Sequence, residues 1–383
     1  MNFLERRLEE LRSRGVYRSL GGSVAGVDFW SNDYLGLARL TDNLGEGPQD
    51  AKQFLEKRAA VPRFISGATG SRSISGDDDR YHLLESAIAE YHGYPAALVY
   101  ASGYLANLGL LSALGTRTDT FLYDELVHAS VRDGMRMSPA RSLRFAHNDV
   151  EDLQRQLGKV RPDGEVFVLT EGRFSMDGDL APLEALSAVC QQFGAHLIVD
   201  EAHSGGLEGK SGAGLVADRQ LQSQVFATLI TYGKAFGAHG AAVLGAPTLR
   251  EYLINRSRAF IYTTGPAPAQ WAGIEQAYQK LSRHHAGQYA ALQRITEHFQ
   301  RLAKDAGLNR FLAAGASGPI QPLVFGDSDR VMELEAACRS AGYLVKGIRH
   351  PTVARGEERI RICLHAFNTE AEVAGLIGVL GHG

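Results

Sequence analysis

The chain has 383 residues, a net charge of −3 at pH 7 and 44% hydrophobic residues, an ordinary composition for a globular protein. At this length about three quarters of the unfolded surface can be buried, so two domains are plausible. The mixed charge forms no basic stripe, which argues against nucleic acid as a partner. No apolar run reaches the ~18 residues needed to span a membrane, so no membrane partner is expected.

The N-terminal segment is predicted to form an amphipathic helix that docks on the rest of the protein. Its apolar residues Phe3, Leu4, Leu8 and Leu11 share one helical face. Glutamates interrupt the segment and it has no apolar signal-peptide core, so no targeting leader is expected. Three widely spaced cysteines in apolar runs are predicted to be buried thiols in a reducing compartment, and we expect a cytoplasmic protein.

The middle of the chain alternates short apolar runs with helical patterns. This alternation predicts βαβ units and a mostly parallel sheet with both faces covered by helices. Helices are expected at residues 103–114, 150–158 and 182–193. The expected strands are AALVY (96–100), TFLY (120–123), VFVLT (166–170), HLIVD (196–200), FATLI (226–230) and AAVLG (241–245).

The pattern changes after about residue 247, where a long helical region replaces the alternation. Short strands and a last helix follow, which predicts a second, smaller α+β domain. The elements expected there are a helix at 266–307, strands at 320–325 and 359–364, and a helix from about 369.

The domain boundaries follow from these changes. We predict an N-terminal helix and arm (1–40), a large α/β domain (41–247), and a linking helix with a small C-terminal α+β domain (248–383). The glycine-rich stretch 61–79 is the one long irregular segment of the large domain, and loops of that length tend to be functional. Open parallel sheets bind ligands at the carboxyl ends of their strands, so a site is expected there.

Polar side chains follow the predicted strands at the points where each strand ends. If the strands are parallel, these side chains gather along one edge of the sheet. A lysine, an aspartate from a buried strand, two histidines and a Ser-Gly turn at a helix start are the parts of a pyridoxal-phosphate site. The residues are Ser102, Gly103, Tyr104, Asp124, His128, Glu171, Ser175, Asp200, His203, Thr231 and Lys234.

Each residue type meets one requirement of that cofactor. The amine of Lys234 can form a Schiff base with the cofactor aldehyde. A carboxylate such as Asp200 beside the pyridine nitrogen keeps the ring protonated, which makes the ring an electron sink. A helix that starts at Gly103 offers free amides to a phosphate, and the hydroxyl of Thr231 adds a donor. An imidazole can stack on the ring face.

Each residue also has a simpler interpretation when it is taken alone. Asp200 is then a helix cap or a salt-bridge partner, His128 a satisfied polar residue and Lys234 a surface lysine. A Ser-Gly-Tyr turn is common in proteins. The coincidence of several such residues at strand ends favours the cofactor site.

Motifs along nearly the whole chain resemble those of the α-oxoamine synthase family of pyridoxal-phosphate enzymes. The resemblance implies the type I aminotransferase fold, with a mostly parallel sheet in the large domain and a smaller α+β C-terminal domain. It also implies pyridoxal 5'-phosphate as cofactor and a homodimer with its sites at the interface. The shared motifs are SNDYLGLA (31–38), GSRSISG (70–76), ASGYLANLGLLSAL (101–114), AHNDVEDL (146–153), TEGRFSMDGDLAPL (170–183), IVDEAHSGG (198–206), TYGKAFGAHGAAVLG (231–245), YTTGPAP (262–268) and RIRICL (359–364).

The resemblance assigns roles to individual residues. Lys234 would hold the Schiff base, Asp200 would pair with the pyridinium nitrogen, and His203 with the cofactor's phenolic oxygen. His128 would stack on the ring, and Arg361 would take the amino-acid carboxylate by its planar two-point fork. The other implied contacts are Gly103, Tyr104 and Thr231 to the phosphate, Thr263 or Thr264 to the neighbouring subunit's phosphate, Ser175 and Glu171 lining the site, Asn32 near the amino acid and Thr352 near the acyl substrate.

The sequence departs from the family's pattern at a few positions. Tyr81 stands where the family often has a histidine, and Ala213 where an arginine is usual. GATGS (67–71) replaces the common GSGGS, and Arg18 is the best candidate for the arginine that contacts the acyl chain. These departures affect the acyl-chain contacts more than the cofactor chemistry.

Three stretches point to the biotin-pathway member of the family: FAHNDV (145–150), IQPLVFGD (320–327) and HPTVARGEERIRI (350–362). That member implies condensation of L-alanine with pimeloyl-CoA or pimeloyl-acyl carrier protein, with loss of CO2 and release of the thiol. Lys234 is then both covalent anchor and general base, and no metal is expected. The alternatives are a sister enzyme that joins glycine to a short acyl-CoA and a non-catalytic partner subunit, which the presence of Lys234 disfavours.

Overall fold

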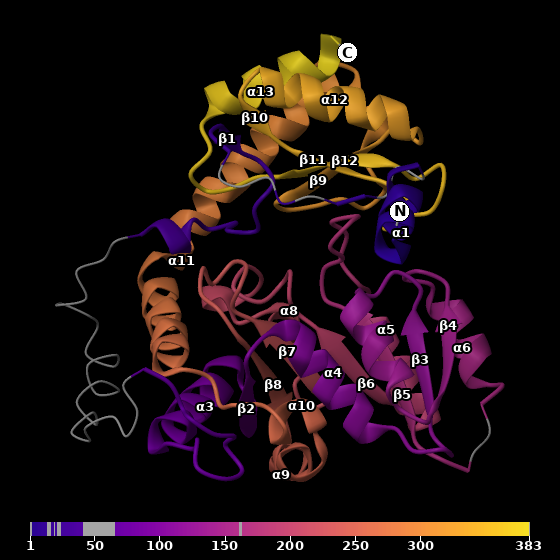
Figure 1. The fold of residues 1–383 in the computed structure, drawn as a ribbon, viewed down its shortest axis with the longest axis vertical. Helices are drawn as coiled ribbons and strands as arrows, with labels where there is room; N and C mark the ends of the chain where they lie inside the picture. Colours follow the sequence, from indigo (N-terminus) through magenta and orange to yellow (C-terminus); the bar gives the residue numbers. More distant parts are fainter. Residues whose placement is uncertain are drawn as a thin grey trace. The chain divides into compact units, whose positions relative to one another are not determined.

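The structure, a computed structural model, forms two compact units (Figure 1). Unit 1 comprises Met1–Ser31, Met176–Gly178 and Ala291–Gly383, and unit 2 comprises Asn32–Ser175 and Asp179–Ala290. The residues that the structure describes are 2–13, 17, 18, 20, 24–40, 66–160 and 163–382.

Unit 2 is built around a seven-stranded sheet in the order β2-β8-β7-β6-β5-β3-β4. Strands β3 to β7 run parallel, while β8 is antiparallel to both of its neighbours, so β2 points in the same direction as β7. The predicted α/β fold with a mostly parallel sheet is confirmed, and the carboxyl ends of β2 and of the parallel strands lie at one edge. The strands are β2 (Ala96–Tyr100), β3 (Thr120–Asp124), β4 (Arg141–Phe145), β5 (Val166–Glu171), β6 (His196–Asp200), β7 (Val225–Thr231) and β8 (Ala241–Gly245).

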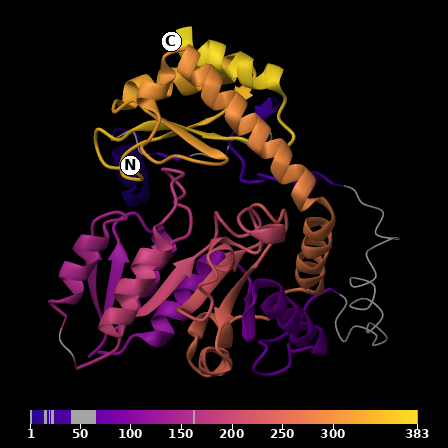
Figure 2. The same cartoon turned by 180° about the vertical axis from the view of Figure 1, so that it is seen from behind.

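Helices cover this sheet (Figure 2). Helices α4, α5, α9 and α10 share one apolar core with its strands. Helix α4 is apolar on almost every side, a pattern typical of a buried helix, and its Leu110 packs in a cluster with Phe121 of β3 and Ala227 of β7. Because α4 is buried in this core, its N-terminus is fixed beside the end of β7. The helices are α3 (Asp79–His92), α4 (Gly103–Leu114), α5 (Ala129–Arg136), α6 (Val150–Leu157), α7 (Leu183–Phe193), α8 (Leu215–Asp218), α9 (Pro247–Arg256) and α10 (Arg258–Ile261).

Unit 1 contains a three-stranded antiparallel sheet in the order β11-β12-β9 and a short parallel pair, β1 with β10. Helix α12 packs against α13 and this sheet, and Val331, Leu334 and Leu376 are buried. Helix α11 (Pro268–Asp305) belongs to both units, which divide it at Ala290. The remaining elements are α1 (Phe3–Ser13), β1 (Val27–Asp28), β9 (Ile320–Val324), α12 (Ser328–Ser340), β10 (Tyr343–Leu344), β11 (Lys346–Ile348), β12 (Arg359–Cys363) and α13 (Glu370–His382).

The predicted strands and helices form within about two residues of their expected bounds. Strand β4 has no counterpart among the predictions, because its sequence, RSLRF, mixes arginines with apolar residues on an exposed edge. Helix α1 forms, but the prediction that it is docked is wrong, since the structure buries none of its residues and leaves Phe3 58% exposed.

The compact units divide the chain after residues 31 and 290, whereas the sequence pattern places its boundaries at 40 and 247. The helical period of the sequence shows that α11 is long, but it does not show which core each half of the helix joins. The predicted division into segments 1–40, 41–247 and 248–383 stays a prediction. Residues 61–65 of the irregular stretch lie outside the described part of the chain. Within that part, no helix combines the length and the apolar character needed to cross a membrane.

Candidate active site

Lys234 lies in the loop of residues 232–240 that joins β7 to β8, here named the lysine turn, at the edge of the sheet predicted to carry the site. The turn is closed by hydrogen bonds from the Tyr232 amide to the Gly240 carbonyl (2.9 Å) and from the Gly237 amide to the Lys234 carbonyl (2.8 Å). Gly237 has φ 64°, and a Cβ there would lie 2.9 Å from Cα of Ala38. The small residues after Lys234 therefore allow a close backbone approach and fix the turn.

The amine of Lys234 is hydrogen-bonded to a buried histidine. Lys234 Nζ lies 2.7 Å from His203 Nε2, and His203 Nδ1 lies 2.7 Å from the hydroxyl of Tyr34. That hydroxyl donates to Oδ1 of Asn32 at 2.9 Å. The structure thus places three predicted site residues, Asn32, His203 and Lys234, on one line of hydrogen bonds.

Asp200 ends strand β6 and is held by two donors. Its Oδ2 accepts from Asn107 Nδ2 at 2.7 Å, and its Oδ1 accepts from the Ala202 amide at 2.9 Å. The residue is only 6% exposed, and Glu171 of β5 is its register partner in the sheet. A buried carboxylate with two fixed hydrogen bonds presents its charge in one direction.

His128 is connected to Asp200 through two side chains. His128 Nδ1 accepts from the Ser130 amide, so the Ser130 hydroxyl, 2.8 Å away, donates to the same nitrogen. The Asn107 amide then donates one proton to Ser130 Oγ at 3.0 Å and the other to Asp200. Burial lowers the pKa of His128; the charge of Asp200 opposes this and that of Lys234 adds to it.

Glu171 is a buried carboxyl group at this edge whose pKa lies well above its ordinary value. Burial raises its pKa to about 8, the charge of Asp200 adds to the rise, and Lys234 and the His128 amide oppose it. That amide donates to Glu171 Oε1 at 2.7 Å. Buried carboxyl groups with raised pKa values are common at functional sites. The charge of Lys234 thus acts on both His128 and Glu171, which links the lysine turn to the residues around Asp200.

The start of α4 and the end of β7 lie against each other. A Cβ at Gly103 would meet Thr231 Oγ1 at 3.2 Å, so glycine leaves room for this approach. The hydroxyl of Ser102 caps the helix by accepting from the Leu105 amide, while the first amides, those of Gly103 and Tyr104, have no acceptor within a helix. These amides and the helix dipole form a donor set suited to a phosphate. The Thr231 hydroxyl lies beside them and donates to the Gly240 carbonyl at 3.2 Å. The Tyr104 side chain is 45% exposed and donates to Asp133 at 2.6 Å.

Three further predicted residues lie on loops of unit 2. Ser175 is half-buried in the loop after β5, while Thr263 is half-buried and Thr264 exposed in the segment between α10 and α11. That segment is joined to the GSRSISG loop by a hydrogen bond from the Gly265 amide to the Gly70 carbonyl (2.9 Å). The role of the two threonines toward a neighbouring subunit stays a prediction.

The predicted substrate residues Arg18, Thr352 and Arg361 belong to unit 1. Arg361 is 7% exposed in β12, and its Nη1 lies 2.9 Å from the sulfur of Cys363. Thr352 and Arg18 are exposed. Their roles toward an amino acid or an acyl chain stay predictions.

Two of the departures from the family pattern, Tyr81 and Ala213, have structural partners. Tyr81 is buried, its hydroxyl donates to the Pro266 carbonyl, and the guanidinium of Arg72 lies 4.2 Å from its ring centre. The carbonyl of Ala213 accepts a hydrogen bond from the buried His92. Both positions thus contribute to packing inside unit 2.

Three residues without a predicted role, Tyr34, Asn107 and Ser130, connect the predicted site residues. Tyr34 and Asn107 stand inside the motifs SNDYLGLA and ASGYLANLGLLSAL. A polar side chain in an otherwise apolar buried helix, as Asn107 is in α4, signals a required hydrogen bond. The sequence does not show which partner receives that bond.

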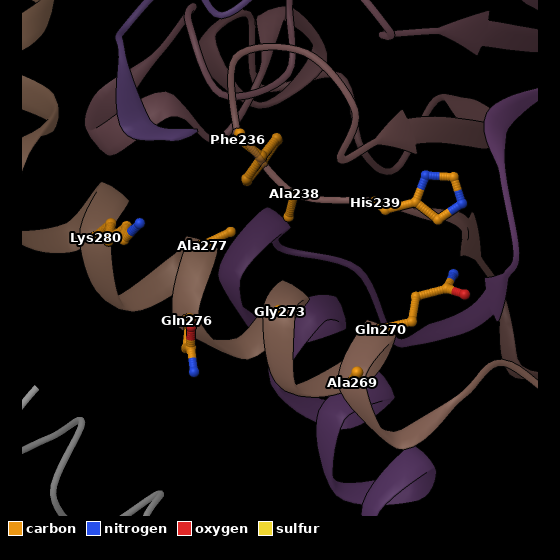
Figure 3. A pocket seen from close by; sticks show the side chains of 10 residues that line it. Phe236, Ala238, His239, Ala269, Gln270, Gly273, Gln276, Ala277 and Lys280 are labelled. Carbon is orange, nitrogen blue, oxygen red and sulfur yellow. The ribbon is translucent and has the colours of Figure 1, made fainter. Parts of the chain in front are cut away.

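A cavity of about 270 Å³ lies next to the lysine turn (Figure 3). Phe236, Ala238 and His239 of the turn line it on one side, and α11 lines it on the other with residues that include Gln270 and Lys280. It contains none of the residues predicted to hold the cofactor.

The fold and this edge of the sheet define the class of protein. The chain belongs to the family of class I and II aminotransferases, whose pattern matches residues 27–380. This agrees with the type I aminotransferase fold and the pyridoxal-phosphate family predicted from the motifs.

Two curated relatives indicate which enzyme of this family the chain resembles in sequence. The chain is 37% identical to the 8-amino-7-oxononanoate synthase of Alkalilimnicola ehrlichii, over 99% of this chain and 96% of that protein. It is 40% identical to the enzyme of that name from Xanthomonas axonopodis pv. citri, over 91% of this chain and 84% of that protein.

The solved structures add a second enzyme class. Sphingomonas wittichii serine palmitoyltransferase matches with a TM-score of 0.86 and 28% identity, covering 99% of this chain and 96% of that one. The 8-amino-7-oxononanoate synthase of Francisella tularensis matches with a TM-score of 0.75 and 26% identity, covering 93% and 97%. The structural likeness thus spans both enzymes, while the sequence likeness is higher to the curated synthases.

Proposed function

We propose that the protein is a pyridoxal-phosphate-dependent C-acyltransferase that condenses L-alanine with pimeloyl-CoA or pimeloyl-acyl carrier protein. The products are 8-amino-7-oxononanoate, CO2 and the free thiol, a step of biotin biosynthesis. The observation that carries the chemistry is the amine of Lys234, 2.7 Å from His203, on the edge that also holds the buried Asp200. The two curated relatives described above, both named 8-amino-7-oxononanoate synthase, support the choice of substrates.

The residues present fit pyridoxal 5'-phosphate. Asp200 is a buried carboxylate fixed by two donors, which suits a pyridinium nitrogen. Gly103 leaves the space a Cβ would fill, so its amide would be accessible to the phosphate. The Thr231 hydroxyl, which donates to the Gly240 carbonyl, would turn to the phosphate when the cofactor is bound. Lys234 would bind the aldehyde carbon covalently, and His128 would stack on the face of the ring. When bound, the cofactor supplies an electron sink for bond breaking at the α-carbon of the amino acid.

The side chains of the site have distinct tasks in this reaction. Asp200 would keep a proton on the pyridine nitrogen of the cofactor, because Asn107 holds its carboxylate charge in place. Lys234 Nζ moves the α-proton of alanine, and His203 Nε2 is the group hydrogen-bonded to that amine. Glu171, with a pKa of about 8, holds the His128 amide and with it the start of α5.

Substitution of Lys234 tests the cofactor assignment. Reduction of the purified protein with borohydride, followed by peptide mass spectrometry, should trap pyridoxal phosphate on Lys234, and Lys234→Ala should lose the label. Lys210→Ala, at an exposed lysine of the same unit, is the matched control and should keep it. A label that persists in Lys234→Ala would refute the assignment.

The substrates are tested by comparing kcat/KM for three pairs. We expect alanine with pimeloyl-CoA to exceed glycine with acetyl-CoA, the reaction of a 2-amino-3-ketobutyrate ligase, and serine with palmitoyl-CoA. The last pair is included because serine palmitoyltransferases are structural neighbours. One methyl group in a pocket is worth only ~10- to 200-fold, so glycine with pimeloyl-CoA should still react slowly. A faster rate for either other pair would replace the proposed substrates.

We also propose a homodimer. Two exposed apolar side chains, Ile74 (88%) and Tyr262 (71%), lie on the joined loops that carry GSRSISG and YTTGPAP. A second copy of the chain would cover them and bring Thr263 and Thr264 to its site. Sedimentation at micromolar concentration should give a dimer, and a fully active monomer would contradict the proposal. The cytoplasmic location stays a prediction that rests on the three isolated cysteines, all buried and free.

A further inference from the structure

Tyr34 occupies the centre of the hydrogen-bonded line that ends at the predicted catalytic lysine. It is fully buried, and its hydroxyl touches both Asn32 Oδ1 (2.9 Å) and His203 Nδ1 (2.7 Å). His203 is 5% exposed and reaches Lys234 Nζ through its other ring nitrogen at 2.7 Å. Every bond of this line lies inside unit 2, and three of its members come from the SNDYLG and DEAH motifs.

The chemistry of the line fixes the direction of its protons. The amide oxygen of Asn32 can only accept, so the single hydroxyl proton of Tyr34 points toward it. The Tyr34 oxygen must then accept from His203, which places a proton on Nδ1. In the neutral ring this leaves Nε2 with its lone pair directed at Lys234.

We propose that Tyr34 is a positioning residue that selects the tautomer of His203, so that Nε2 faces Lys234 as a hydrogen-bond acceptor. This deepens the proposed function and rests on it for its catalytic meaning. A lysine that must give up a proton to act as nucleophile or base benefits from a fixed acceptor within hydrogen-bond distance. Tyr34 acts through His203 and is not itself placed at the reacting atoms.

The opposite direction of the line has a different chemical consequence. If Asn32 presented its NH2 group to Tyr34, the hydroxyl would donate to Nδ1 and a proton would sit on Nε2. That N–H would then donate to the amine of Lys234 in place of accepting from it. The two arrangements differ in the protonated ring nitrogen, which can be measured directly.

The test is nitrogen-15 NMR of the histidine rings in the protein freed of cofactor, near pH 8. We expect His203 to show a protonated Nδ1 and an unprotonated Nε2, while Tyr34→Phe shifts a measurable fraction of the ring to the Nε2–H form. Asn32→Asp keeps the acceptor and should keep the wild-type tautomer. Tyr94→Phe removes another buried hydroxyl, bonded to Thr228 at 2.5 Å, and should also leave His203 unchanged.

A second measurement connects the tautomer to turnover. In the loaded enzyme, Tyr34→Phe should lower kcat about 5- to 10-fold, as expected for loss of one hydrogen bond, with little change in KM for alanine. The pH profile of kcat should shift in Tyr34→Phe but not in Tyr94→Phe.

The outcomes that overturn the inference are separate from those that overturn the proposed function. An Nε2–H tautomer in the wild-type protein, or an unchanged Nδ1–H tautomer in Tyr34→Phe, refutes the role of Tyr34. Both of these outcomes come from NMR of the cofactor-free protein, so they test the role of Tyr34 even if alanine and pimeloyl-CoA do not react. A wild-type protein with the expected tautomer and no such activity would refute the proposed substrates alone.

Discussion

Two histidines of unit 2 have both ring nitrogens hydrogen-bonded, yet the structure gives them opposite charge states. Burial lowers the pKa of His92 to about 4, against an ordinary 6.5, and one backbone hydrogen bond only partly opposes it. Burial also acts against a charge on His147, but hydrogen bonds to two carboxylates outweigh it and raise its pKa to about 10. The chemistry of the hydrogen-bond partners, and not burial alone, therefore decides which histidine is charged.

The region around His147 is an ionic junction at the carboxyl edge of the sheet. His147, which follows β4, reaches Asp124 at the end of β3 (3.0 Å) and Asp179 in the loop after β5 (2.8 Å). Asn148 adds a hydrogen bond to Asp179 at 2.6 Å, and the His147 ring packs edge-on against Phe174. One imidazolium thus joins the ends of three strands, close in sequence to His128 and Ser175.

The region around His92 is a neutral line of hydrogen bonds. Because the Ala213 carbonyl can only accept, His92 Nδ1 donates to it (2.7 Å) and Nε2 accepts from the hydroxyl of Tyr278 (2.7 Å). Tyr278 in turn accepts from Tyr232 at 3.1 Å. Tyr232 stands two residues before Lys234, so a line without charge fixes the base of the lysine turn.

The largest expected effect is at the ionic junction. His147→Gln should lower the free energy of unfolding by about 3 kcal/mol, because it leaves two carboxylates without their shared cation. This loss is at the low end of the range expected for breaking a buried ion pair, because the His147 side chain is 23% exposed. Urea unfolding measures it.

The matched control for this variant is His196→Gln. His196 also reaches a carboxylate, that of Glu165 at 2.8 Å, but both side chains are at least a third exposed. An exposed pair of this kind contributes less than about 1 kcal/mol. Equal losses in the two variants would show that the junction is not special.

The second effect is at the neutral line. His92→Leu should lower the free energy of unfolding by about 2 kcal/mol, because the Tyr278 hydroxyl and the Ala213 carbonyl each lose a hydrogen-bond partner. Urea unfolding at pH 7 measures this loss. A loss below about 0.5 kcal/mol would show that the line can be satisfied in another way.

The third effect is on the pH dependence of stability. His92 has a lowered pKa in the folded chain, so stability should fall as pH drops from about 6.5 to about 4. His147 has a raised pKa, so its stabilisation is complete below 6.5 and is lost as pH rises to about 10. The two histidines therefore act on opposite sides of neutrality.

The contribution of each histidine is obtained from the difference in free energy of unfolding between wild type and variant at each pH. Glu171 and Glu201, with burial-raised pKa values of about 8 and 7, titrate in the same range. The difference for His147→Gln should decrease toward pH 10, and the difference for His92→Leu should decrease toward pH 4. A difference that stays constant across either range would mean that the histidine does not change protonation on unfolding.

The sequence predicts the secondary structure of this fold better than it predicts how buried polar residues connect. Apolar runs with period two or with helical spacing locate most elements, because burial of those residues is a local property of the pattern. Strand β4 and the exposed face of α1 escape such a prediction, since whether an apolar residue is covered depends on the rest of the chain.

In the candidate site, too, the sequence predicts the position of residues better than their hydrogen-bond partners. Strand ends predict that Lys234, Asp200 and His203 gather at one edge, because parallel strands finish together. The pairing of Asn107 with Asp200 joins residues 93 positions apart, and no local pattern encodes it. Hydrogen-bond partners follow from the packing of α4 on the sheet, which only the folded chain shows.

The smallest expected effect tests the direction of the neutral line. Tyr232→Phe should lower the free energy of unfolding by only about 0.5 kcal/mol, because Tyr232 is the terminal donor and its loss leaves no buried proton without an acceptor. Tyr278→Phe should have a larger effect, about 2 kcal/mol, because His92 Nε2 loses its donor and Tyr232 its acceptor. Both substitutions remove a single oxygen, from the fully buried ring of Tyr232 and the half-buried ring of Tyr278, so cavity differences are small and urea unfolding compares them directly. If Tyr232→Phe had the larger effect, the hydrogen bonds would be donated in the direction from His92 to Tyr278 to Tyr232, which requires His92 Nε2 to donate. That result would contradict a neutral His92 that donates to the Ala213 carbonyl, and with it the contrast to His147.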